Sequence, residues 1–365
     1  MPNIFTFATS ELSTSAFYAW LLENLNPKHT STPETKQVAL EFTNYCLGKA
    51  TIAPLAAVDI KDLQVTTEQQ LNKTCRIDIY AKFTKIDDSL IHLFIENKVQ
   101  ANETKKDQLI EYDKAIKGKA LTGDIAEIYL KSGYDFADPL HCKDIKGKVV
   151  CKGTFKKINW QDLQIIFSPH RGASSDFIRD MASCVENKYN FINSQKSASS
   201  FADFDLNDHV GQSFLLQTIF HSCFSSNVPL YTSTVNGRTR THYNNKCYLQ
   251  VGNSKGKPWT KFVPFLGQNI LKCRLEELTG GYVLRLGIHI PKDDLPTKQT
   301  YIKAQCNKMH DKIDATGLGF VKKLTPSGNT SALFFAQISL STKGSTLSIA
   351  DLQKLDDVVQ NYVVP

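Results

Sequence analysis

The chain has 365 residues, which is longer than one ordinary domain and predicts two domains with room for full-sized cores. Its composition is that of a soluble globular protein, with 41% hydrophobic and 22% charged residues and no excess of glycine or proline. This balance excludes a low-complexity chain. The formal net charge of +7 is compatible with a nucleic-acid partner but does not require one.

The cysteines and the apolar segments indicate an intracellular protein. The nine cysteines are scattered and never spaced as Cys-x-x-Cys, so reduced thiols fit better than a disulfide framework or a zinc site. No segment approaches the length of a membrane span. No glycine-rich loop of the Walker type is present. We therefore expect a cytoplasmic protein that works without a membrane and binds no ATP.

In the first half, the patterns predict helices and strands in alternation. The predicted helices span residues 11–25, 33–47, 102–117, 160–167 and 174–191, and the predicted strands span 63–68, 76–83, 90–99 and 125–130. Asp87-Asp88-Ser89 has the composition of a hairpin turn between the second and third strands. This order predicts an α/β fold in which a mixed sheet is flanked by helices.

The second half begins after a Ser-rich segment, 193–200, which has few apolar residues and is predicted to be the domain boundary. The predicted domains are therefore residues 1–195 and 196–365. Beyond the boundary we predict an amphipathic helix at 206–224, strands at 247–251, 282–290 and 332–340, and a final helix at 349–362. We interpret this half as a smaller α+β domain.

Two stretches of the chain are strongly basic. Residues 237–275 contain eight lysines and arginines and no acidic residue, and residues 143–157 contain six lysines against the single acid Asp144. Such stretches suit contacts with phosphates, but lysine-rich solvated loops explain them equally well. In the first stretch we single out Arg238 and Arg240 as candidate substrate-binding residues. We expect a nucleic-acid-binding or dimerisation role for the second half.

The residues that can carry chemistry lie on two of the predicted strands. In Arg76-Ile77-Asp78-Ile79-Tyr80, the period of two places Asp78 on the face opposite the two isoleucines. On the next strand, Glu96 and Lys98 share one face by the same argument. A hairpin of these two strands brings Asp78 beside Glu96 and Lys98.

Two carboxylates at the end of an apolar strand pair repel one another and lose hydration unless a cation neutralises them. A hard divalent ion, Mg²⁺ with Mn²⁺ as a substitute, does this through oxygen ligands without a complete protein cage. Lys98 then points at the same centre, where it can stabilise charge on a phosphate or help to deprotonate an attacking water. A purely structural interpretation stays open, because Asp78 could pair with Arg76 and Glu-x-Lys recurs by chance.

With these residues the sequence resembles the PD-(D/E)XK nuclease superfamily, whose hallmark is an acid on one strand and Glu-x-Lys on the next. Asp78 matches the acid and Glu96-Asn97-Lys98 matches Glu-x-Lys, although Ile77 replaces the proline of the family name. The resemblance covers about residues 5–135 and implies a restriction-endonuclease-like sheet. It also implies that Asp78, Glu96 and the main-chain carbonyl of Asn97 hold Mg²⁺, with Lys98 as a catalytic residue.

Further residues match the family in order. Glu11 matches a metal-site glutamate that members often add from the first helix. Gln108 and Tyr112 reproduce a Gln-x-x-x-Tyr motif of the branch that includes recombination-helicase nucleases, at a spacing that places both on one helix face. Glu68 fits the second glutamate of a prokaryotic subgroup with Arg-Ile-Asp-Ile, Ile-Glu-Asn-Lys and Gln-Leu-x-x-Tyr motifs. The resemblance thus implies a catalytic role for Gln108 and substrate contacts for Tyr112 and Glu68.

Each of these three matches also has a structural explanation. An acid in the first turn of a helix, such as Glu11, is favoured by the helix dipole. Glu68 could simply end a strand, and Gln108 and Tyr112 could be an ordinary pair on a helix surface.

The family resemblance implies a metal-dependent deoxyribonuclease whose partner is DNA. Antiphage defence or restriction is the first biological role that it suggests, and DNA repair the second. A homodimer would suit cleavage of both strands of a duplex, although nothing in the sequence requires one. Two alternatives stay open: a catalytically silent nucleic-acid-binding protein, and a metal-dependent RNase or toxin with the same site.

Overall fold

The computed structural model describes residues 3, 5, 10–99, 108–133, 141–143, 149–151, 154–221, 229–235, 238–243, 247–254, 257–266, 269–278, 281–289, 295–319, 321–324, 332–342 and 345–363. The chain divides into two compact units, one of Met1–His141 with Val150–Phe191 and one of Cys142–Val149 with Ile192–Pro365. The division falls inside helix α6 (Asp176–Ser197). Among the described helices, none has the length and apolar character needed to cross a bilayer.

Helix α6 extends into the Ser-rich segment that was predicted to be the boundary. Ile192 and Gln195 are buried. The amide of Gln195 donates to the carbonyl of Asp203 (3.2 Å) and accepts from the main-chain N–H of Asp205 (2.8 Å). These contacts hold the helix to Ser197 although the local composition is polar.

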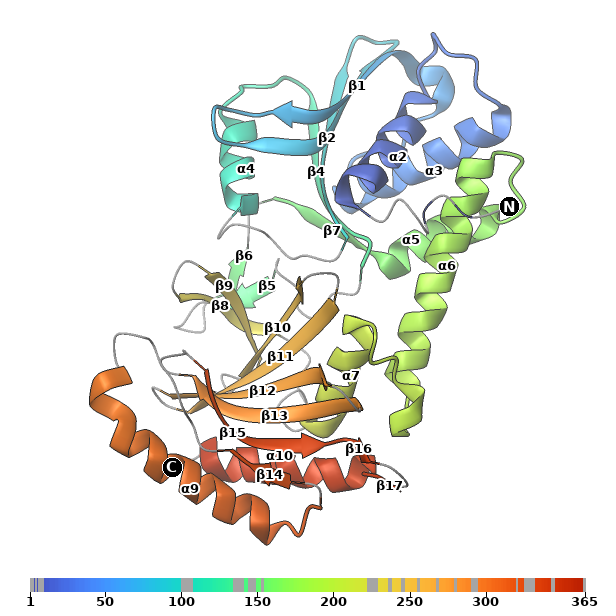
Figure 1. Cartoon of the computed structure of the whole chain (residues 1–365). Coiled ribbons are helices and arrows are strands. Elements are labelled where there is room, and N and C mark those ends of the chain that lie inside the picture. The colour runs from blue at the N-terminus through green and yellow to red at the C-terminus, as the bar shows by residue number, and fades with distance from the viewer. Residues whose placement is uncertain are drawn as a thin grey trace. The chain divides into compact units, whose positions relative to one another are not determined.

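The first unit is built on a five-stranded mixed sheet (Figure 1). Its strands are β1 (Ile60–Gln70), β2 (Arg76–Lys85), β3 (Leu90–Lys98), β4 (Asp124–Lys131) and β7 (Lys156–Asn159), in the order β1-β2-β3-β4-β7. The first three strands are antiparallel, and β3-β4 and β4-β7 are parallel. The α/β fold with a mixed sheet is therefore confirmed.

The β2–β3 hairpin forms at the predicted turn. The main-chain N–H and the hydroxyl of Ser89 donate to the carboxylate of Asp87, and Asp88 adopts a left-handed φ of 62°. Aspartate tolerates this conformation better than most residues with a Cβ. The turn sets the register, which pairs Thr84 with Leu90 and continues to Ile79 with Ile95.

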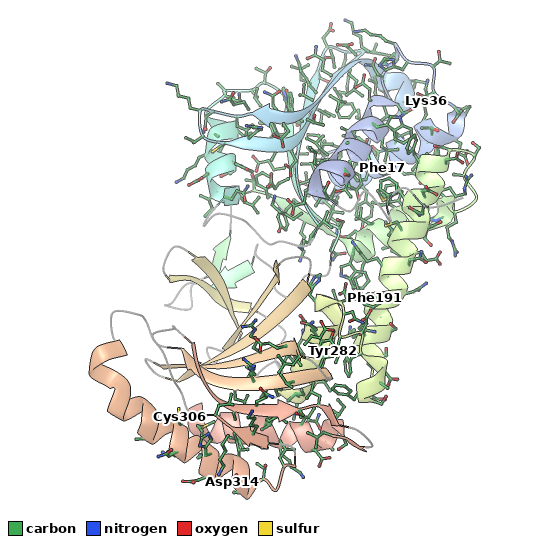
Figure 2. All side chains as sticks on the ribbon, in the orientation of Figure 1. Phe17, Lys36, Phe191, Tyr282, Cys306 and Asp314 are labelled. Carbon is green, nitrogen blue, oxygen red and sulfur yellow. The ribbon has the colours of Figure 1, made fainter. Side chains whose placement is uncertain are left out.

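Helices cover both faces of this sheet. The helices α2 (Glu11–Glu23), α3 (Pro33–Lys49), α5 (Trp160–Phe167) and α6 contribute to the larger hydrophobic cluster, into which Phe17 of α2 packs (Figure 2). The helix α4 (Gln108–Lys117) packs Leu109, Tyr112 and Ile116 against Phe94 in a second cluster. Ser10 caps α2 by accepting a hydrogen bond from the main-chain N–H of Ser13 (3.1 Å).

The face alternation of β2 changes at Asp78. Ile79 belongs to the larger cluster, but Ile77 packs with Phe94 and Tyr112 in the cluster under α4. The prediction that both isoleucines share a face is therefore wrong. The strand departs from regular alternation at the residue that matters most for the site.

The second unit contains a large, mainly antiparallel sheet, in which β5 pairs with β8 in parallel. The strands of the ten-stranded sheet are, in spatial order, β14 (Val321–Lys323), β15 (Ala332–Ser339), β13 (Gly281–His289), β12 (Asn269–Leu278), β11 (Lys257–Leu266), β10 (Cys247–Ser254), β9 (Arg238–Tyr243), β8 (Pro229–Val235), β5 (His141–Lys143) and β6 (Val149–Cys151). A short hairpin, β16 (Ser341–Thr342) with β17 (Ser345–Thr346), follows β15. The helices are α7 (His209–Ile219), α9 (Leu295–Ala315) and α10 (Ile349–Val363), and α7 and α10 contact each other and β11.

The basic stretch 237–275 lies mainly on four of these strands, β9 to β12. Its interpretation as a solvated loop is therefore wrong. The sheet accommodates many cations because one strand face can stay polar while the other packs against helices.

Candidate active site

Asp78 lies where the regular pairing of β2 is interrupted on both sides. On the β1 side it stands opposite Glu68, which has a left-handed φ of 54°. On the β3 side the ladder ends at Ile79 and Ile95, and the carboxylate of Asp78 accepts a hydrogen bond from the main-chain N–H of Asn97 (2.7 Å). Asp78 is therefore fixed against the end of β3 by its side chain.

Lys98 is the centre of a charged cluster on β3. Its Nζ lies 2.8 Å from Oε1 of Glu96 and 3.3 Å from Oε2 of Glu11 at the start of α2. The side chains of Lys98 and Glu96 are 6% and 2% exposed, and that of Glu11 is 36% exposed. The cluster thus opens toward solvent on the side of Glu11.

Burial governs the ionisation of the two acids. Burial raises the pKa of Asp78, although Lys98 and the N–H of Asn97 oppose the shift. Burial, followed by the charge of Asp78, also raises the pKa of Glu96 well above its usual range. Burial by itself lowers the pKa of Lys98, but Glu96 and the other carboxylates outweigh it, so the pKa lies above its usual range. Ionising both acids together therefore costs free energy that a further cation would recover.

The side-chain amide of Asn97 joins β3 to α2. Its Nδ2 donates to the carbonyl of Glu11 (3.1 Å), to Oγ1 of Thr14 (2.7 Å) and to Oγ of Ser15 (3.0 Å). Asn97 is fully buried. The sequence interpretation missed Thr14 and Ser15, although their i+3 and i+4 spacing from Glu11 places all three on one helix face.

Gln108 and Tyr112 reach the site from α4 on the other side of Glu96. The amide of Gln108 donates to Oε1 of Glu96 (3.0 Å) and to the hydroxyl of Tyr112 (2.6 Å). Both side chains are nearly buried, at 7% exposure each. The geometry therefore does not fit the alternative of an ordinary surface pair.

The carboxylate of Glu68 makes none of the described contacts of this cluster. It pairs with Arg76 in an exposed ion pair, and its charge helps to raise the pKa of Asp78. Arg238 and Arg240 lie on β9 in the second unit, where the structure describes the backbone and not the side chains.

The donor set fits a divalent cation held by few protein ligands. In the described part of the chain, Oε2 of Glu96 is buried and has no hydrogen-bond partner, and Asp78 uses Oδ2 for Asn97. An unpaired buried carboxylate oxygen is costly, and a cation would satisfy it. The described residues contain no group of three His, Cys, Asp or Glu side chains that could hold a metal. A Mg²⁺ site does not need such a group, because it usually keeps several waters.

A second lysine, which the sequence interpretation missed, lies beside Lys98. Lys131 is paired with Lys98 in the parallel register of β3 and β4. Its side chain is fully buried, and its Nζ donates to the carbonyl of Val99 (3.4 Å). Nothing in the sequence indicated this residue, because its proximity follows from the strand register alone.

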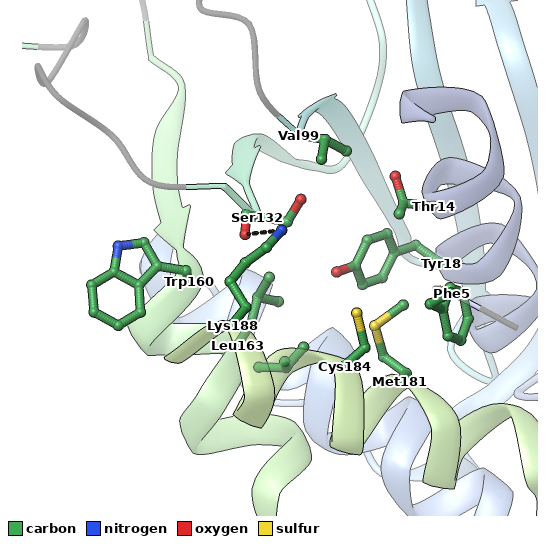
Figure 3. A pocket seen from close by; sticks show the side chains of 11 residues that line it. Phe5, Thr14, Tyr18, Val99, Ser132, Trp160, Leu163, Met181, Cys184 and Lys188 are labelled. Atoms are coloured by element: carbon green, nitrogen blue, oxygen red, sulfur yellow. Dashed lines mark hydrogen bonds between the residues drawn. The ribbon is translucent and has the colours of Figure 1, made fainter. Parts of the chain in front are cut away.

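A cavity of about 190 Å³ adjoins the ends of β3 and β4 (Figure 3). Thr14 and Val99 line it next to the site, and Lys188 crosses it to donate to the carbonyl of Ser132 (3.1 Å). The main-chain N–H of Ser132 in turn donates to the carbonyl of Lys98 (3.1 Å). The cavity therefore borders the backbone that carries the charged cluster.

A mixed sheet that carries two converging carboxylates and a lysine at the ends of neighbouring strands is the arrangement of a phosphodiester-cleaving nuclease. The comparison with known families agrees, since a family model described as the PD-(D/E)XK nuclease superfamily matches residues 2–202. The match covers more than half of the 365 residues, and the chain belongs to this superfamily. No curated protein and no solved structure matches the chain.

Proposed function

We propose that the chain is a Mg²⁺-dependent nuclease that hydrolyses phosphodiester bonds of DNA. The observation that supports this most directly is the convergence of Asp78, Glu96 and Lys98, with one buried oxygen of Glu96 unpartnered among the described residues. Superfamily membership supports nuclease chemistry. The choice of DNA rests on the family resemblance.

In this proposal Asp78, Glu96 and the main-chain carbonyl of Asn97 hold the cation. When bound, Mg²⁺ would neutralise charge on the phosphate and lower the pKa of water. The hydrogen bonds from the side chain of Asn97 to α2 keep this part of β3 in place. The main-chain N–H of Asn97 holds the carboxylate of Asp78 in a fixed orientation.

Lys98 would act on the scissile phosphate as a hydrogen-bond donor. Its raised pKa keeps it protonated at neutral pH, which suits stabilisation of negative charge on a phosphate oxygen or orientation of the attacking water. Hydrolysis forms a bond between phosphorus and the water oxygen and breaks the bond to the leaving oxygen. Glu11, at 3.3 Å from Lys98, would hold the ammonium group in position.

Gln108 would orient Glu96, and Tyr112 would orient Gln108. The two hydrogen bonds of the Gln108 amide form a chain from the hydroxyl of Tyr112 to the carboxylate of Glu96. Because Tyr112 is 7% exposed, we assign it to this support role before a direct contact with substrate.

The basic second unit would supply sequence-independent contacts with the phosphate backbone, with Arg238 and Arg240 of β9 among the candidates. Restriction of invading DNA is the biological role that we propose first, and DNA repair the second. Both roles rest on the family resemblance alone.

The test of this proposal is degradation of a substrate panel by the full chain with Mg²⁺, with Mn²⁺ and with EDTA. The panel contains single-stranded, double-stranded and branched DNA and a structured RNA. Cleavage of DNA that requires the metal supports the proposal. Cleavage of RNA alone would replace it with an RNase or toxin, and tight binding of DNA without cleavage of any substrate would indicate a silent binding protein.

A further inference from the structure

Basic residues occupy paired positions on four of five neighbouring strands of the second sheet. In the antiparallel registers, Lys261 of β11 pairs with Arg274 of β12, and Arg274 pairs with Arg285 of β13. Arg285 pairs with Gln337 of β15, which pairs with Lys322 of β14. Because directly paired residues stand on the same face of a sheet, these positions form one row. We call Arg274, Arg285 and Lys322 the cation row.

The cation row lies on the sheet face opposite to the core residues that flank it on each strand. The residues next to the row on the same strands are core residues, each at most 2% exposed: Cys273, Leu275, Leu284, Leu286, Ala336 and Ile338. Successive residues of a strand point to opposite faces, so the row faces away from this core. Arg274 and Arg285 are 33% and 27% exposed, and Lys322 is exposed.

A single carboxylate lies within the described part of the row. Glu276 is two residues from Arg274 on β12, and its two oxygens lie 2.8 Å from Nη2 of Arg274 and 2.9 Å from Nε of Arg285. Like charges on directly paired residues repel one another, and the carboxylate of Glu276 offsets this repulsion between the two guanidinium groups. The described cations of the row still exceed this one acid, and an anionic partner would complement the excess.

We propose that the cation row binds the phosphate backbone of a nucleic acid that crosses strands β12 to β14. The proposal rests on the proposed nuclease function, and it assigns the substrate-holding surface of the second unit to these residues. Neighbouring strands are about 4.8 Å apart, so the row places charges on β12, β13 and β14 over roughly 14 Å, with the uncharged Gln337 of β15 between the last two. A polymer with a regular series of phosphates matches such a row better than a compact acidic patch does.

The experiment measures binding of a fluorescent DNA duplex to the full chain by anisotropy, over a series of KCl concentrations and in EDTA. EDTA prevents metal-dependent cleavage, so a loss of binding is distinguished from a failure of the nuclease proposal. In Lys322→Glu we expect the dissociation constant to rise by about three- to tenfold, and the slope of log K against log salt to become shallower by about one. The matched control is Lys308→Glu, an exposed lysine on α9, which should leave both unchanged.

A second variant should change the affinity for DNA in the opposite direction. Glu276→Gln removes the one acid of the row and should tighten binding by about two- to fivefold, whereas mere damage to the sheet would weaken it. The control is Glu277→Gln, the next residue on β12, which occupies the opposite face. Equal effects of Lys322→Glu and Lys308→Glu would overturn the proposal, as would unchanged or weaker binding by Glu276→Gln.

Discussion

The carboxylate of Asp78 accepts a hydrogen bond of 2.7 Å from the main-chain N–H of Asn97. The two residues belong to neighbouring strands whose regular ladder ends one pair earlier, at Ile79 and Ile95. A side chain therefore replaces a ladder hydrogen bond at this point. The consequence is that the first acid of the site and the backbone between Glu96 and Lys98 are held as one unit.

Replacement of Asn97 should uncouple helix α2 from the site. Asn97→Ala removes three hydrogen bonds to Glu11, Thr14 and Ser15 and leaves a small cavity. We expect a loss of about 2–4 kcal/mol in the free energy of unfolding. Chemical denaturation of the full chain measures it, with Asn72→Ala in the exposed β1–β2 turn as a milder control. A loss of stability no greater than that of the control would contradict the role of Asn97 as the link between β3 and α2.

Gln108 and Tyr112 should differ in their effect on cleavage, because only Gln108 contacts Glu96. Gln108→Ala should lower the cleavage rate by about 10²-fold, and Tyr112→Phe, which removes one hydroxyl, by about tenfold or less. The measurement is the single-turnover rate at saturating Mg²⁺. The reverse order would mean that Tyr112 contacts the substrate directly.

The variant Glu68→Gly tests whether the left-handed backbone at residue 68 contributes to the site. Its φ of 54° is unfavourable for a residue with a Cβ, and its carboxylate makes an exposed pair with Arg76. Glu68→Gly should leave the melting temperature unchanged or raise it, since relief of the left-handed conformation is worth up to about 1 kcal/mol. The family resemblance implies a substrate contact for Glu68, and on that prediction the cleavage rate falls nonetheless. Full activity in a stable Glu68→Gly variant would reduce Glu68 to a structural role.

Glu127 on β4 should make stability depend on pH. It is 4% exposed, and burial together with the charge of Asp113 raises its pKa from 4.5 to about 7. The folded state therefore retains a proton that the unfolded state loses, so the stability from this group is present below pH 4.5 and is lost as the pH rises through 7. Glu127→Gln should be more stable than the wild type at pH 8, by on the order of 1–3 kcal/mol, and not at pH 4.5. Calorimetry of the full chain at both values checks this, and a pH-independent difference would contradict it.

The sequence was sufficient to predict four of the five strands of the first sheet because their signals are local, whereas β7 was not predicted. The hairpin needs only the alternation around Asp78 and Glu96 and the turn at Asp87-Asp88-Ser89, and α2 and α3 start at clear caps, Ser10 and Thr32. The strands β8, β9, β11 and β12 were missed. Basic residues obscured the alternation of apolar positions in β9, β11 and β12, and the pairing that stabilises all four strands is not visible in a single segment.

The residues that surround the site could not be predicted from the sequence, because tertiary contacts bring them there. Thr14 and Ser15 contact Asn97 because α2 packs across the end of β3, and Lys131 lies beside Lys98 because β4 joins β3 in parallel. Neither arrangement follows from the spacing of residues along the chain. The sequence motif nevertheless identified Asp78, Glu96 and Lys98, whose side chains lie at the centre of the cluster.

The most direct test of the central claim is cleavage of plasmid and linear duplex DNA with Mg²⁺ by the wild type, Lys98→Ala and Asp78→Ala. Removal of either residue should lower the rate by at least about 10³-fold. Circular dichroism and denaturation of both variants, with Lys61→Ala as an exposed-lysine control, separate a loss of chemistry from a loss of folding. We predict that the wild type and Lys61→Ala cleave DNA and that EDTA stops this cleavage. We predict no cleavage by Lys98→Ala or Asp78→Ala. Cleavage that survives both substitutions in folded protein would contradict the account.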